Sequence, residues 1–428
     1  MAWNPEAETL PRERLRALQL ERLRQTVQRQ LDHVAPMRDR LHAAGVTSGH
    51  DIASLDELPR LPFSHKADLR EHYPFGLFAV PTTEVVRIHA SSGTRGKPTI
   101  VGYTRHDLGV WSEVMARTLA AAGVRSGMVV HNAYGYGLFT GGLGFHMGAE
   151  LMGCMVVPIS GGLSQRQALL LEDLRGQVLC STPSYALNIA QTLSEQGVGL
   201  DRLALQVGIF GAEPWTEQLR DALKRQLGIK ALNAYGLSEI VGPGVAGECI
   251  EGRDGAHVQE DHFLVEVIDP STGAVLGPGQ DGELVFTTLT KEALPMLRYR
   301  TGDISRLDVT PCVCGRTSVR MARVRGRYDD MLIIRGVNLY PSEVERVLLR
   351  VPDVAPHYQL VVDRPGAMDE LTVVCEPAGS VDIDGLRQRI QYALREATGL
   401  SMHIQLEAPG SVPRSEGKAV RVIDNRPR

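Results

Sequence analysis

A glycine-rich segment, Ser91-Ser-Gly-Thr-Arg-Gly-Lys97, combines small residues, hydroxyl groups and one lysine directly after an apolar run. The backbone amides of such a turn, together with a lysine cation, can surround phosphate oxygens. The segment is not a Walker loop, because its two glycines are too close together and Pro98 follows Lys97. A flexible surface turn has the same composition, so this segment alone predicts a phosphate site without establishing one.

Four more segments with residues suited to chemistry follow in order along the chain. They are Tyr235-Gly-Leu-Ser-Glu239, Tyr299-Arg-Thr-Gly-Asp303, Gly326-Arg-Tyr-Asp329 and Glu416-Gly-Lys418. Each has an ordinary alternative when it is read in isolation. Glu239 could be a solvated acid at a helix end, Asp303 a turn residue, and Lys418 a surface lysine.

Together the five segments resemble the ordered signatures of the acyl-adenylate-forming superfamily, which includes acyl-CoA synthetases, peptide-synthetase adenylation domains and luciferases. The nearest resemblance is to the phenylacetate-CoA ligase family. Further matching segments extend it over almost the whole chain: Tyr73-Pro-Phe-Gly76, Tyr134 to Gly142, Gly211-Ala-Glu-Pro-Trp215 and Asp330 to Asn338. The resemblance implies that the chain activates an aromatic acid, phenylacetate or a related aryl acid, with ATP through an acyl-AMP. Transfer to coenzyme A would then give aryl-CoA, AMP and pyrophosphate.

The resemblance also implies roles for individual residues. Lys418 and Glu239 would be catalytic: Lys418 would neutralise the charge that develops during adenylation, and Glu239 would ligate Mg²⁺. The residues expected to bind ATP or coenzyme A are Ser92, Thr94, Lys97, Gly211, Ala212, Glu213, Pro214, Asn233, Tyr235, Gly236, Ser238, Asp303, Arg327, Arg335 and Gly336. Among them, Ser92, Thr94 and Lys97 would hold phosphates. The turn at Gly211 and the Tyr235 ring would enclose adenine, and Asp303 would accept hydrogen bonds from ribose.

A second state of the enzyme is implied as well. Asp329 would be a hinge about which the C-terminal domain rotates, so that Lys418 leaves the site and Arg335 and Gly336 face it. The incoming thiol would then have a path to the acyl-adenylate.

Small, aromatic and soft side chains suited to a flat slot for one ring gather in one stretch of the sequence. The predicted acyl pocket comprises Tyr136, Phe139, Gly141, Phe145 and Met147, beside the Gly211 turn. Gly144-Phe-His-Met-Gly148 departs from the Ala-His-Tyr that is usual in phenylacetate-CoA ligases, which leaves a benzoate or a hydroxylated or amino-substituted arene as alternatives. Phe145 and Met147 could also be core packing.

Cys312 and Cys314, which lie two residues apart before Gly315, can share one metal ion. Cys249 and His257 fall in the same predicted β region and would complete a Cys₃His structural zinc site. The alternatives are ordinary buried cysteines, or a Cys249 and His257 that line the acyl pocket. Cys154, Cys180 and Cys375 lie in apolar runs and are expected in the core.

The sequence patterns of the helices and strands that must position these residues predict an α/β fold. Short apolar runs between about Gly127 and Gly211 alternate with helix-compatible stretches, which indicates βαβ units around a parallel sheet. Strands at Phe263 to Ile268 and Glu283 to Thr288 predict a small β subdomain. We expect an N-terminal adenylate-forming domain over residues 1–326 and a small mobile α+β domain over residues 327–428, with the hinge near Asp329. The second domain should contain a helix opened near Pro341 and another ended by Gly399.

Composition restricts the partners. The 428 residues are 43% apolar, and 46 basic against 50 acidic residues give a net charge of -4, so no nucleic-acid partner is expected. No long apolar run predicts a membrane span, and we expect a cytoplasmic protein. The family resemblance favours a homodimer. An aryl-acid adenylating enzyme that loads a carrier protein or an amine is the alternative function. An inactive adenylate-binding regulator would be expected to lack Lys418 or Glu239, and both are present.

Overall fold

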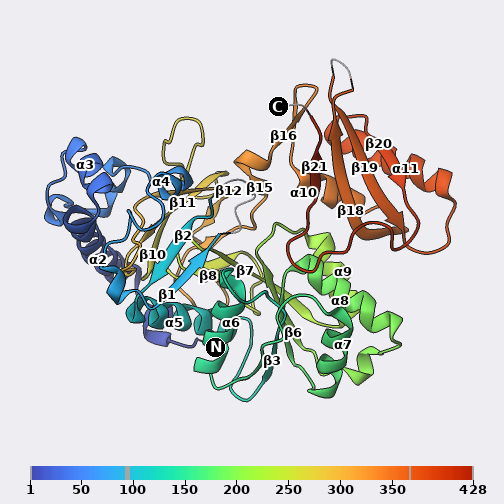
Figure 1. Cartoon of the computed structure of the whole chain (residues 1–428), viewed down its shortest axis with the longest axis horizontal. Helices are drawn as coiled ribbons and strands as arrows, with labels where there is room; N and C mark the ends of the chain where they lie inside the picture. Colours follow the sequence, from blue (N-terminus) through green and yellow to red (C-terminus); the bar gives the residue numbers. More distant parts are fainter. Residues whose placement is uncertain (1, 92–96, 366–367, 427–428) are drawn as a thin grey trace.

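The computed structural model describes residues 2–91, 97–365 and 368–426, and its centre is a nine-stranded sheet (Figure 1). Five neighbouring strands are parallel: β4 (Met155–Val157), β3 (Val129–Asn132), β5 (Val178–Ser181), β6 (Val207–Gly211) and β7 (Lys230–Leu237). The sheet continues antiparallel with β8 (Gly242–Glu248), β9 (Ala256–Val258), β14 (Arg320–Met321) and β13 (Leu307–Asp308). The predicted parallel βαβ core is therefore confirmed.

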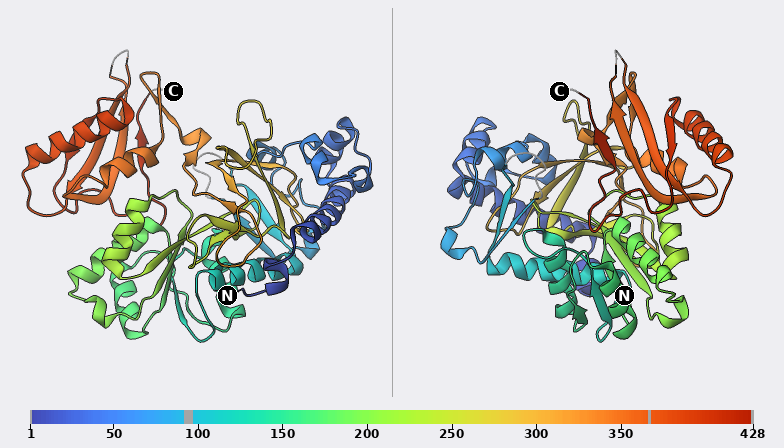
Figure 2. Two further views of the ribbon diagram at one scale, coloured as in Figure 1. Left: turned by 180° about the vertical axis from the view of Figure 1, so that it is seen from behind. Right: turned by 45° about the vertical axis from the view of Figure 1, so that its right-hand side comes forward.

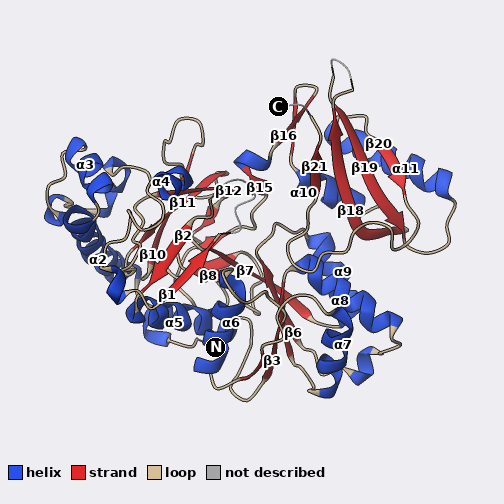
Figure 3. Ribbon diagram, viewed as in Figure 1, coloured by secondary structure: helices blue, strands red, loops and turns tan. Residues whose placement is uncertain are grey.

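Helices cover both faces of this sheet, which explains why the parallel strands β5 and β6 are buried along their whole length (Figure 3). One face carries α5 (Arg105–Ala121) and α6 (Thr140–Leu151), and the other carries α7 (Ser164–Asp173), α8 (Pro183–Glu195) and α9 (Glu217–Leu227). Successive residues of β5 point to opposite faces of the sheet and pack into the hydrophobic core on each face. Val178 and Cys180 pack with α5 and α6, whereas Leu179 packs with α7 to α9. The prediction of Cys180 and Cys375 as core residues is confirmed, while Cys154 is only partly buried.

Two smaller antiparallel units flank the central sheet. A four-stranded sheet contains β10 (Phe263–Ile268), β11 (Gly282–Thr288), β12 (Tyr299–Ser305) and β15 (Gly326–Arg327), which confirms the predicted β subdomain. The second unit is the antiparallel pair of β1 (Arg87–Ala90) and β2 (Ile100–Tyr103), which flank the glycine-rich segment in the sequence.

Among the described residues, four α-helices precede β1 in the chain. They are α1 (Pro5–Glu8), α2 (Arg12–His33), α3 (Ala35–Ala43) and α4 (Lys66–Glu71). Leu23 and Val27 of α2 pack on Leu289 and Leu297.

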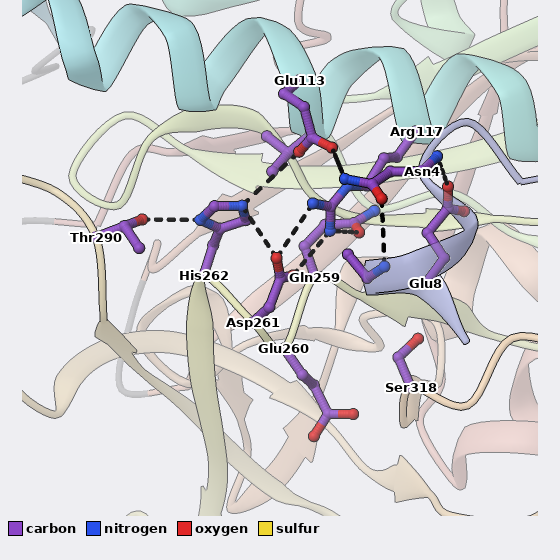
Figure 4. A network of polar contacts seen from close by, with 12 residues as sticks. Asn4, Glu8, Glu113, Arg117, Gln259, Glu260, Asp261, His262, Thr290 and Ser318 are labelled. Carbon is purple, nitrogen blue, oxygen red and sulfur yellow. Dashed lines mark hydrogen bonds and ion pairs between the residues drawn. The ribbon is translucent and has the colours of Figure 1, made fainter. Parts of the chain in front are cut away.

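A buried polar network reinforces the same region (Figure 4). Arg117 of α5 makes two hydrogen bonds with Asp261, at 2.8 and 3.1 Å. His262 Nδ1 then meets Thr290 Oγ1 at 2.9 Å, so the network ends at the residue before Lys291.

The C-terminal unit has a core of its own. It contains the hairpin β16 (Leu332–Ile334) and β17 (Val337–Leu339), the helices α10 (Pro341–Leu348) and α11 (Ile383–Thr398), and the sheet β20 (His403–Leu406), β19 (Glu370–Pro377), β18 (Val354–Asp363) and β21 (Val422–Asp424). Gly399 ends α11 at a φ of 72°, a left-handed conformation that glycine adopts without strain. In all views this unit stands beside α8 and α9 (Figures 1 and 2).

The connection between the two units lies at Arg327. This residue ends β15, which still pairs with β12, and the turn Tyr328–Asp330 leads on to β16. The predicted boundary between residues 326 and 327 therefore falls inside a short strand of the first unit. Among the described residues, no helix is both long enough and apolar enough to cross a membrane.

Candidate active site

The turn after β6 meets the C-terminal unit. A Cβ at Gly211 would lie 2.1 Å from the carbonyl oxygen of Ala234, so only glycine fits there. Ala212 has a φ of 71° and is exposed. The Glu213 carboxylate accepts hydrogen bonds from the backbone N–H groups of Ser184 and Ala419, both at 2.8 Å. Because the protein itself uses that carboxylate, a nucleotide would meet mainly the backbone of this turn and Pro214.

Beside this turn, Tyr235 and Asp303 form a hydrogen-bonded pair. The Tyr235 hydroxyl donates to Asp303 Oδ2 at 2.7 Å, and its ring stacks on Phe286. Arg327 Nη1 lies 3.4 Å from Asp303 Oδ1, while its other nitrogens donate to Asp329 at 2.8 and 3.0 Å. Burial raises the pKa of Asp303, and Arg327 opposes that shift. The Asp303 carboxylate is therefore a hydrogen-bond acceptor held in place beside Tyr235 of β7.

Asn233, in the same strand, is almost fully buried. Its Oδ1 accepts a hydrogen bond from the Trp215 indole at 3.0 Å. The structure therefore places Asn233 under the turn that begins at Gly211.

Glu239 follows β7 and has only 5% of its surface exposed. Its Oε1 accepts a 3.4 Å hydrogen bond from Thr99 and lies 3.9 Å from Lys66 Nζ. Ser238 beside it bonds to Thr140 at 3.1 Å. A Cβ at Gly236 would approach Gly242 O to 1.9 Å, so the turn requires glycine. A buried carboxylate with such weak partners is a suitable ligand for a hard cation.

The glycine-rich segment can be placed only in part. Ser92 and Thr94 lie outside the described residues, so their predicted contacts stay predictions. Lys97 is exposed, with its Nζ 4.9 Å above the Tyr73 ring. Thr99 connects this segment to Glu239. The sequence did not indicate a role for Thr99 or Lys66, although Thr99 directly follows Lys97 and Pro98.

Lys291 is a further buried cation near Glu239 that no sequence pattern indicated. It is 6% exposed, and its Nζ lies 4.6 Å over the Tyr103 ring without a hydrogen-bond acceptor among the described residues. Burial lowers its pKa to about 8, and the charges of Asp107 and Glu239 oppose the shift.

Lys418 reaches this region from the C-terminal unit. Its neighbours fix its backbone: the Thr182 hydroxyl donates to Gly417 O at 2.7 Å, and Ala419 N donates to Glu213. Lys418 keeps water-accessible surface, yet surrounding protein lowers its pKa by desolvation, while Glu213, Asp303 and Glu239 oppose that shift. The predicted catalytic lysine thus lies within electrostatic reach of the predicted ribose and metal ligands.

Arg335 and Gly336 are not brought to this region. Both are exposed on the β16–β17 hairpin, which lies at the far end of the C-terminal unit from α8 and α9 (Figure 1). Arg335 Nε donates to Asp369 O at 2.9 Å, within its own unit.

The predicted acyl-pocket residues separate into two groups. Tyr136 and Phe139 are partly buried near Lys418, whose Nζ lies 5.7 Å from the Phe139 ring centre. The Tyr136 hydroxyl accepts from Asn132 at 2.8 Å and contacts His146 Nδ1 at 3.1 Å. A Cβ at Gly141 would lie 2.5 Å from the Phe139 ring, so glycine there leaves room for that ring.

Phe145 and Met147 form the second group. Phe145 is 1% exposed and stacks on Tyr134 with ring centres 4.9 Å apart, which favours the core-packing alternative for this residue. Met147 is partly buried, and its Sδ accepts a hydrogen bond from Arg87 at 3.0 Å.

The four predicted zinc ligands come together at the end of the central sheet. One ligand atom from each of Cys249, His257, Cys312 and Cys314 lies within 4.8 Å of the others. Cys314 Sγ is 3.3 Å from His257 Nε2, and His257 Nδ1 contacts Ser318 Oγ at 3.2 Å. In metal sites, a hydrogen bond at the ring nitrogen that does not bind the metal orients the imidazole, and the contact with Ser318 is of this type. The donor set and its clustering fit a closed tetrahedral zinc site.

Most of the chain is similar to known AMP-binding enzymes. The family model of AMP-binding enzymes matches residues 26–289, and that of the AMP-binding enzyme C-terminal domain matches residues 336–426. Phenylacetate-coenzyme A ligase from Thermus thermophilus is 53% identical, with 100% of both chains covered. The Escherichia coli phenylacetate-coenzyme A ligase is 48% identical over 98% of this chain and 97% of that one.

Solved structures of 2-hydroxyisobutyryl-CoA ligase distinguish the arrangement of the two units. With 2-HIB-AMP in the postadenylation state, the TM-score is 0.92 at 30% identity, covering 98% of this chain and 92% of that one. With 2-HIB-AMP and CoA in the thioesterfication state, it is 0.75 at 31% identity, covering 99% and 92%. Sequence similarity and coverage are nearly equal, so the present arrangement of the units is closer to the postadenylation one.

Proposed function

Because this chain belongs to the phenylacetate-coenzyme A ligase family of AMP-binding enzymes, we propose that it converts phenylacetate or a closely related aryl acid into its coenzyme A thioester. In the first half-reaction a carboxylate oxygen attacks the α-phosphorus of ATP, and pyrophosphate leaves. In the second, the thiol sulfur attacks the acyl carbon, its proton is lost, and AMP leaves. One observation supports the proposal most strongly. Lys418 of the C-terminal unit lies close enough to Asp303 and Glu239 of the first unit for their charges to act on it.

The nucleotide would bind where β6 and β7 end, as ligands do in open α/β sheets. Adenine would lie between the ring of Tyr235 and the backbone of residues 211–214, with Asn233, Gly236 and Ser238 forming the wall beneath. Asp303 would accept the ribose hydroxyls, and Arg327 would approach the ribose and the phosphate. Ser92, Thr94 and Lys97 would hold the β- and γ-phosphates. The 2.7 Å bond between Tyr235 and Asp303 supports this placement, because it fixes the acceptor beside the ring.

Glu239 would hold Mg²⁺, which offsets phosphate charge when it is bound. The residue is buried, ionisable and only weakly bonded to Thr99, which fits a hard oxygen-ligated cation. Lys66 and Lys291 add positive charge on the protein side of the same carboxylate.

Lys418 would stabilise the charge that develops as the acid attacks ATP. An ammonium group fixed before the reaction is effective because no reorganisation is required when charge forms. We propose that the first unit, which ends at Arg327, binds both substrates and that the C-terminal unit then rotates about Asp329. Lys418 would leave, and Arg335 and Gly336 would reach the site for the thiol step. The exposed hairpin that carries them supports this division of roles.

The acid would lie against Tyr136, Phe139 and Gly141, with the carboxylate toward Lys418. The 5.7 Å separation of Lys418 Nζ from the Phe139 ring supports that orientation. The Tyr136 hydroxyl and His146 provide one polar edge, which could discriminate among ring substituents. Met147 remains part of the proposed pocket, whereas Phe145 would act through the packing beneath it.

We include structural zinc at Cys249, His257, Cys312 and Cys314 in the proposal. Zinc bound there would stabilise the fold, because the four protein ligands leave no open position for chemistry. The cytoplasmic location and the homodimer expected from the resemblance also belong to the proposal.

The experiment that tests the function measures pyrophosphate release across phenylacetate, benzoate and hydroxy- or amino-benzoates, then looks by mass for the thioester after free coenzyme A is added. We expect release with at least one aryl acid and conversion to its coenzyme A thioester. Acyl-AMP that forms but does not react with coenzyme A would instead indicate carrier-protein or amine loading. Absence of pyrophosphate release with every acid would contradict the proposal.

A further inference from the structure

Two carboxylates join the C-terminal unit to the first unit in opposite directions. Glu213, from the first unit, accepts the backbone N–H of Ala419 at 2.8 Å. Glu345, from the C-terminal unit, accepts the backbone N–H of Thr216 at 3.1 Å. We call Glu213 and Glu345 the carboxylate pair. Each unit thus contributes one hydrogen-bond acceptor and one donor to the junction. In the first unit, the acceptor Glu213 and the donor Thr216 are three residues apart in the sequence.

The first-unit donors are parts of helix N-termini. Thr216 is the N-cap of α9, and Ser184, whose N–H also bonds to Glu213 at 2.8 Å, lies in the first turn of α8. Amides at helix N-termini lack intrahelical acceptors and carry partial positive charge, so a carboxylate is a favourable partner. Both carboxylates therefore engage groups that would otherwise require water.

Arg421 completes the junction between the two members of the carboxylate pair. Its Nη2 donates to Ser184 Oγ at 3.1 Å and lies 3.8 Å from Glu345 Oε2. Its guanidinium also covers the Tyr358 ring at 4.3 Å, and Tyr358 donates a 3.2 Å hydrogen bond to Glu345. Glu345 is 3% exposed, so its charge is stabilised by these partners and not by bulk water.

The junction fixes the chain on both sides of Lys418. Thr182 of the first unit donates to Gly417 O, and Glu213 accepts from Ala419 N, so the residues immediately before and after Lys418 are both held. Neither contact uses the Lys418 side chain, so its ammonium group remains available to a substrate. Backbone contacts on either side of a reacting group limit its misplacement, and small misplacements strongly reduce rates.

We propose that the carboxylate pair positions Lys418 for adenylate formation and that its bonds must break before the thiol step. Glu213 and Glu345 are positioning residues, since they act through the backbone of the Lys418 segment. This inference rests on the proposed function, and it assigns to Glu213 a role different from nucleotide binding. Bonds that form in only one of two arrangements favour that arrangement by their free energy, and the ratio of the two populations changes exponentially with it.

The test compares Glu213→Gln and Glu345→Gln with the matched surface variants Glu217→Gln on α9 and Glu343→Gln on α10, both of which are exposed in the full-length protein. Single-turnover pyrophosphate release reports the first half-reaction, and thioester formation from supplied aryl-AMP and coenzyme A reports the second. Amide hydrogen exchange at Ala419 and Thr216 reports the two bonds directly.

We expect each carboxylate-pair variant to slow adenylate formation about tenfold, because the neutral amide oxygen of glutamine accepts a weaker hydrogen bond from a backbone N–H than a carboxylate does. Thioester formation should stay unchanged or become faster. Exchange should accelerate at Ala419 in Glu213→Gln and at Thr216 in Glu345→Gln, with the KM for ATP unchanged. The surface variants should behave as the unsubstituted protein in every measurement.

Equal slowing of both half-reactions would overturn the positioning role, as would a raised KM for ATP with unchanged adenylation kcat in Glu213→Gln. Melting temperatures separate misfolding from these outcomes, and a variant that melts early is replaced by Arg421→Gln, which removes the cation between the pair. Failure of the unsubstituted protein in both half-reactions would instead overturn the proposed function.

Discussion

The ammonium group of Lys418 lies 5.7 Å from the centre of the Phe139 ring, although the two residues come from different structural units. Phe139 precedes α6 in the predicted acyl pocket, and Lys418 precedes β21 in the C-terminal unit. The contact places a cation at the edge of the pocket where the carboxylate of an aromatic acid would lie. Under the proposed mechanism, in which Lys418 serves the first half-reaction, this arrangement would suit adenylate formation.

Replacing Lys418 by alanine should slow adenylate formation by about 10²-fold or more, since one preorganised cation opposite developing charge is worth several kcal/mol. Thioester formation from supplied aryl-AMP should largely survive. Single-turnover assays of the two half-reactions measure this, with Lys224→Ala on the exposed surface of α9 as the control. Equal damage to both half-reactions would reject the alternation of the C-terminal unit.

Lys291 makes stability depend on pH in a direction that can be calculated. Its folded-state pKa of about 8 lies below the ordinary lysine pKa of 10.5, so between these values the unfolded chain binds more protons. Stability from this group therefore rises with pH across that window and carries its full penalty below pH 8. Lys291→Met should raise the free energy of unfolding at pH 7 by about 3 kcal/mol.

Denaturant unfolding at several pH values between 7 and 10 measures this prediction. The advantage of Lys291→Met over the unsubstituted protein should shrink steadily above pH 8. The exposed Lys224→Met provides the control. A stability advantage that does not change with pH would show that the pKa of Lys291 is the same in the folded and unfolded states.

Zinc should be found at about one ion per chain in protein purified without added metal. Replacing Cys312 and Cys314 by serine should lower the melting temperature before it lowers the intrinsic rates, because a closed four-ligand site contributes folding energy. Elemental analysis and thermal unfolding measure both effects. Cys154→Ser is the control, since that thiol lies outside the cluster. Metal-free protein with unchanged melting in the double variant would remove zinc from the account.

The pocket residues should separate into two classes by their effects on different acids. Tyr136→Phe and Met147→Tyr should change the ratio of kcat/KM between phenylacetate and the hydroxy- or amino-benzoates by about 10- to 100-fold. Phe145→Ala should lower stability by about 3 kcal/mol through loss of its stack on Tyr134 and reduce activity on all acids alike. Pyrophosphate release measures the ratios. Selective effects of Phe145→Ala would return that residue to the pocket wall.

Local patterns in the sequence predicted the elements well. The apolar runs of the parallel strands, the proline that opens α10 and the glycine that ends α11 act within a few residues, so their consequences can be predicted without the fold. The grouping of Cys249, His257, Cys312 and Cys314 could also be predicted, because cysteine and histidine restrict the alternatives. Phe145 was ambiguous for the opposite reason, since a phenylalanine on a glycine-rich helix suits a pocket and a core equally.

Long-range partners were not predictable. Glu213 stands in a segment that resembles a nucleotide-binding turn, and nothing in that segment indicates a bond to Ala419, 206 residues later. Lys291 has no local pattern that marks it as buried; its position depends on the loop that Asp107 holds through the backbone of Glu292 and Ala293. Such contacts follow from how the units pack together, which the sequence of one segment does not contain.

The most direct test of the central claim follows the oxygen atoms of the acid. Phenylacetate, or the aryl acid most active in pyrophosphate release, would be labelled with ¹⁸O in its carboxylate and converted in the presence of ATP and coenzyme A. Attack of a carboxylate oxygen on the α-phosphorus transfers that oxygen to AMP when the thiol displaces it. The account predicts AMP carrying one ¹⁸O atom and unlabelled pyrophosphate by mass spectrometry. Label in inorganic phosphate, with ADP as the other product, would contradict the acyl-adenylate route.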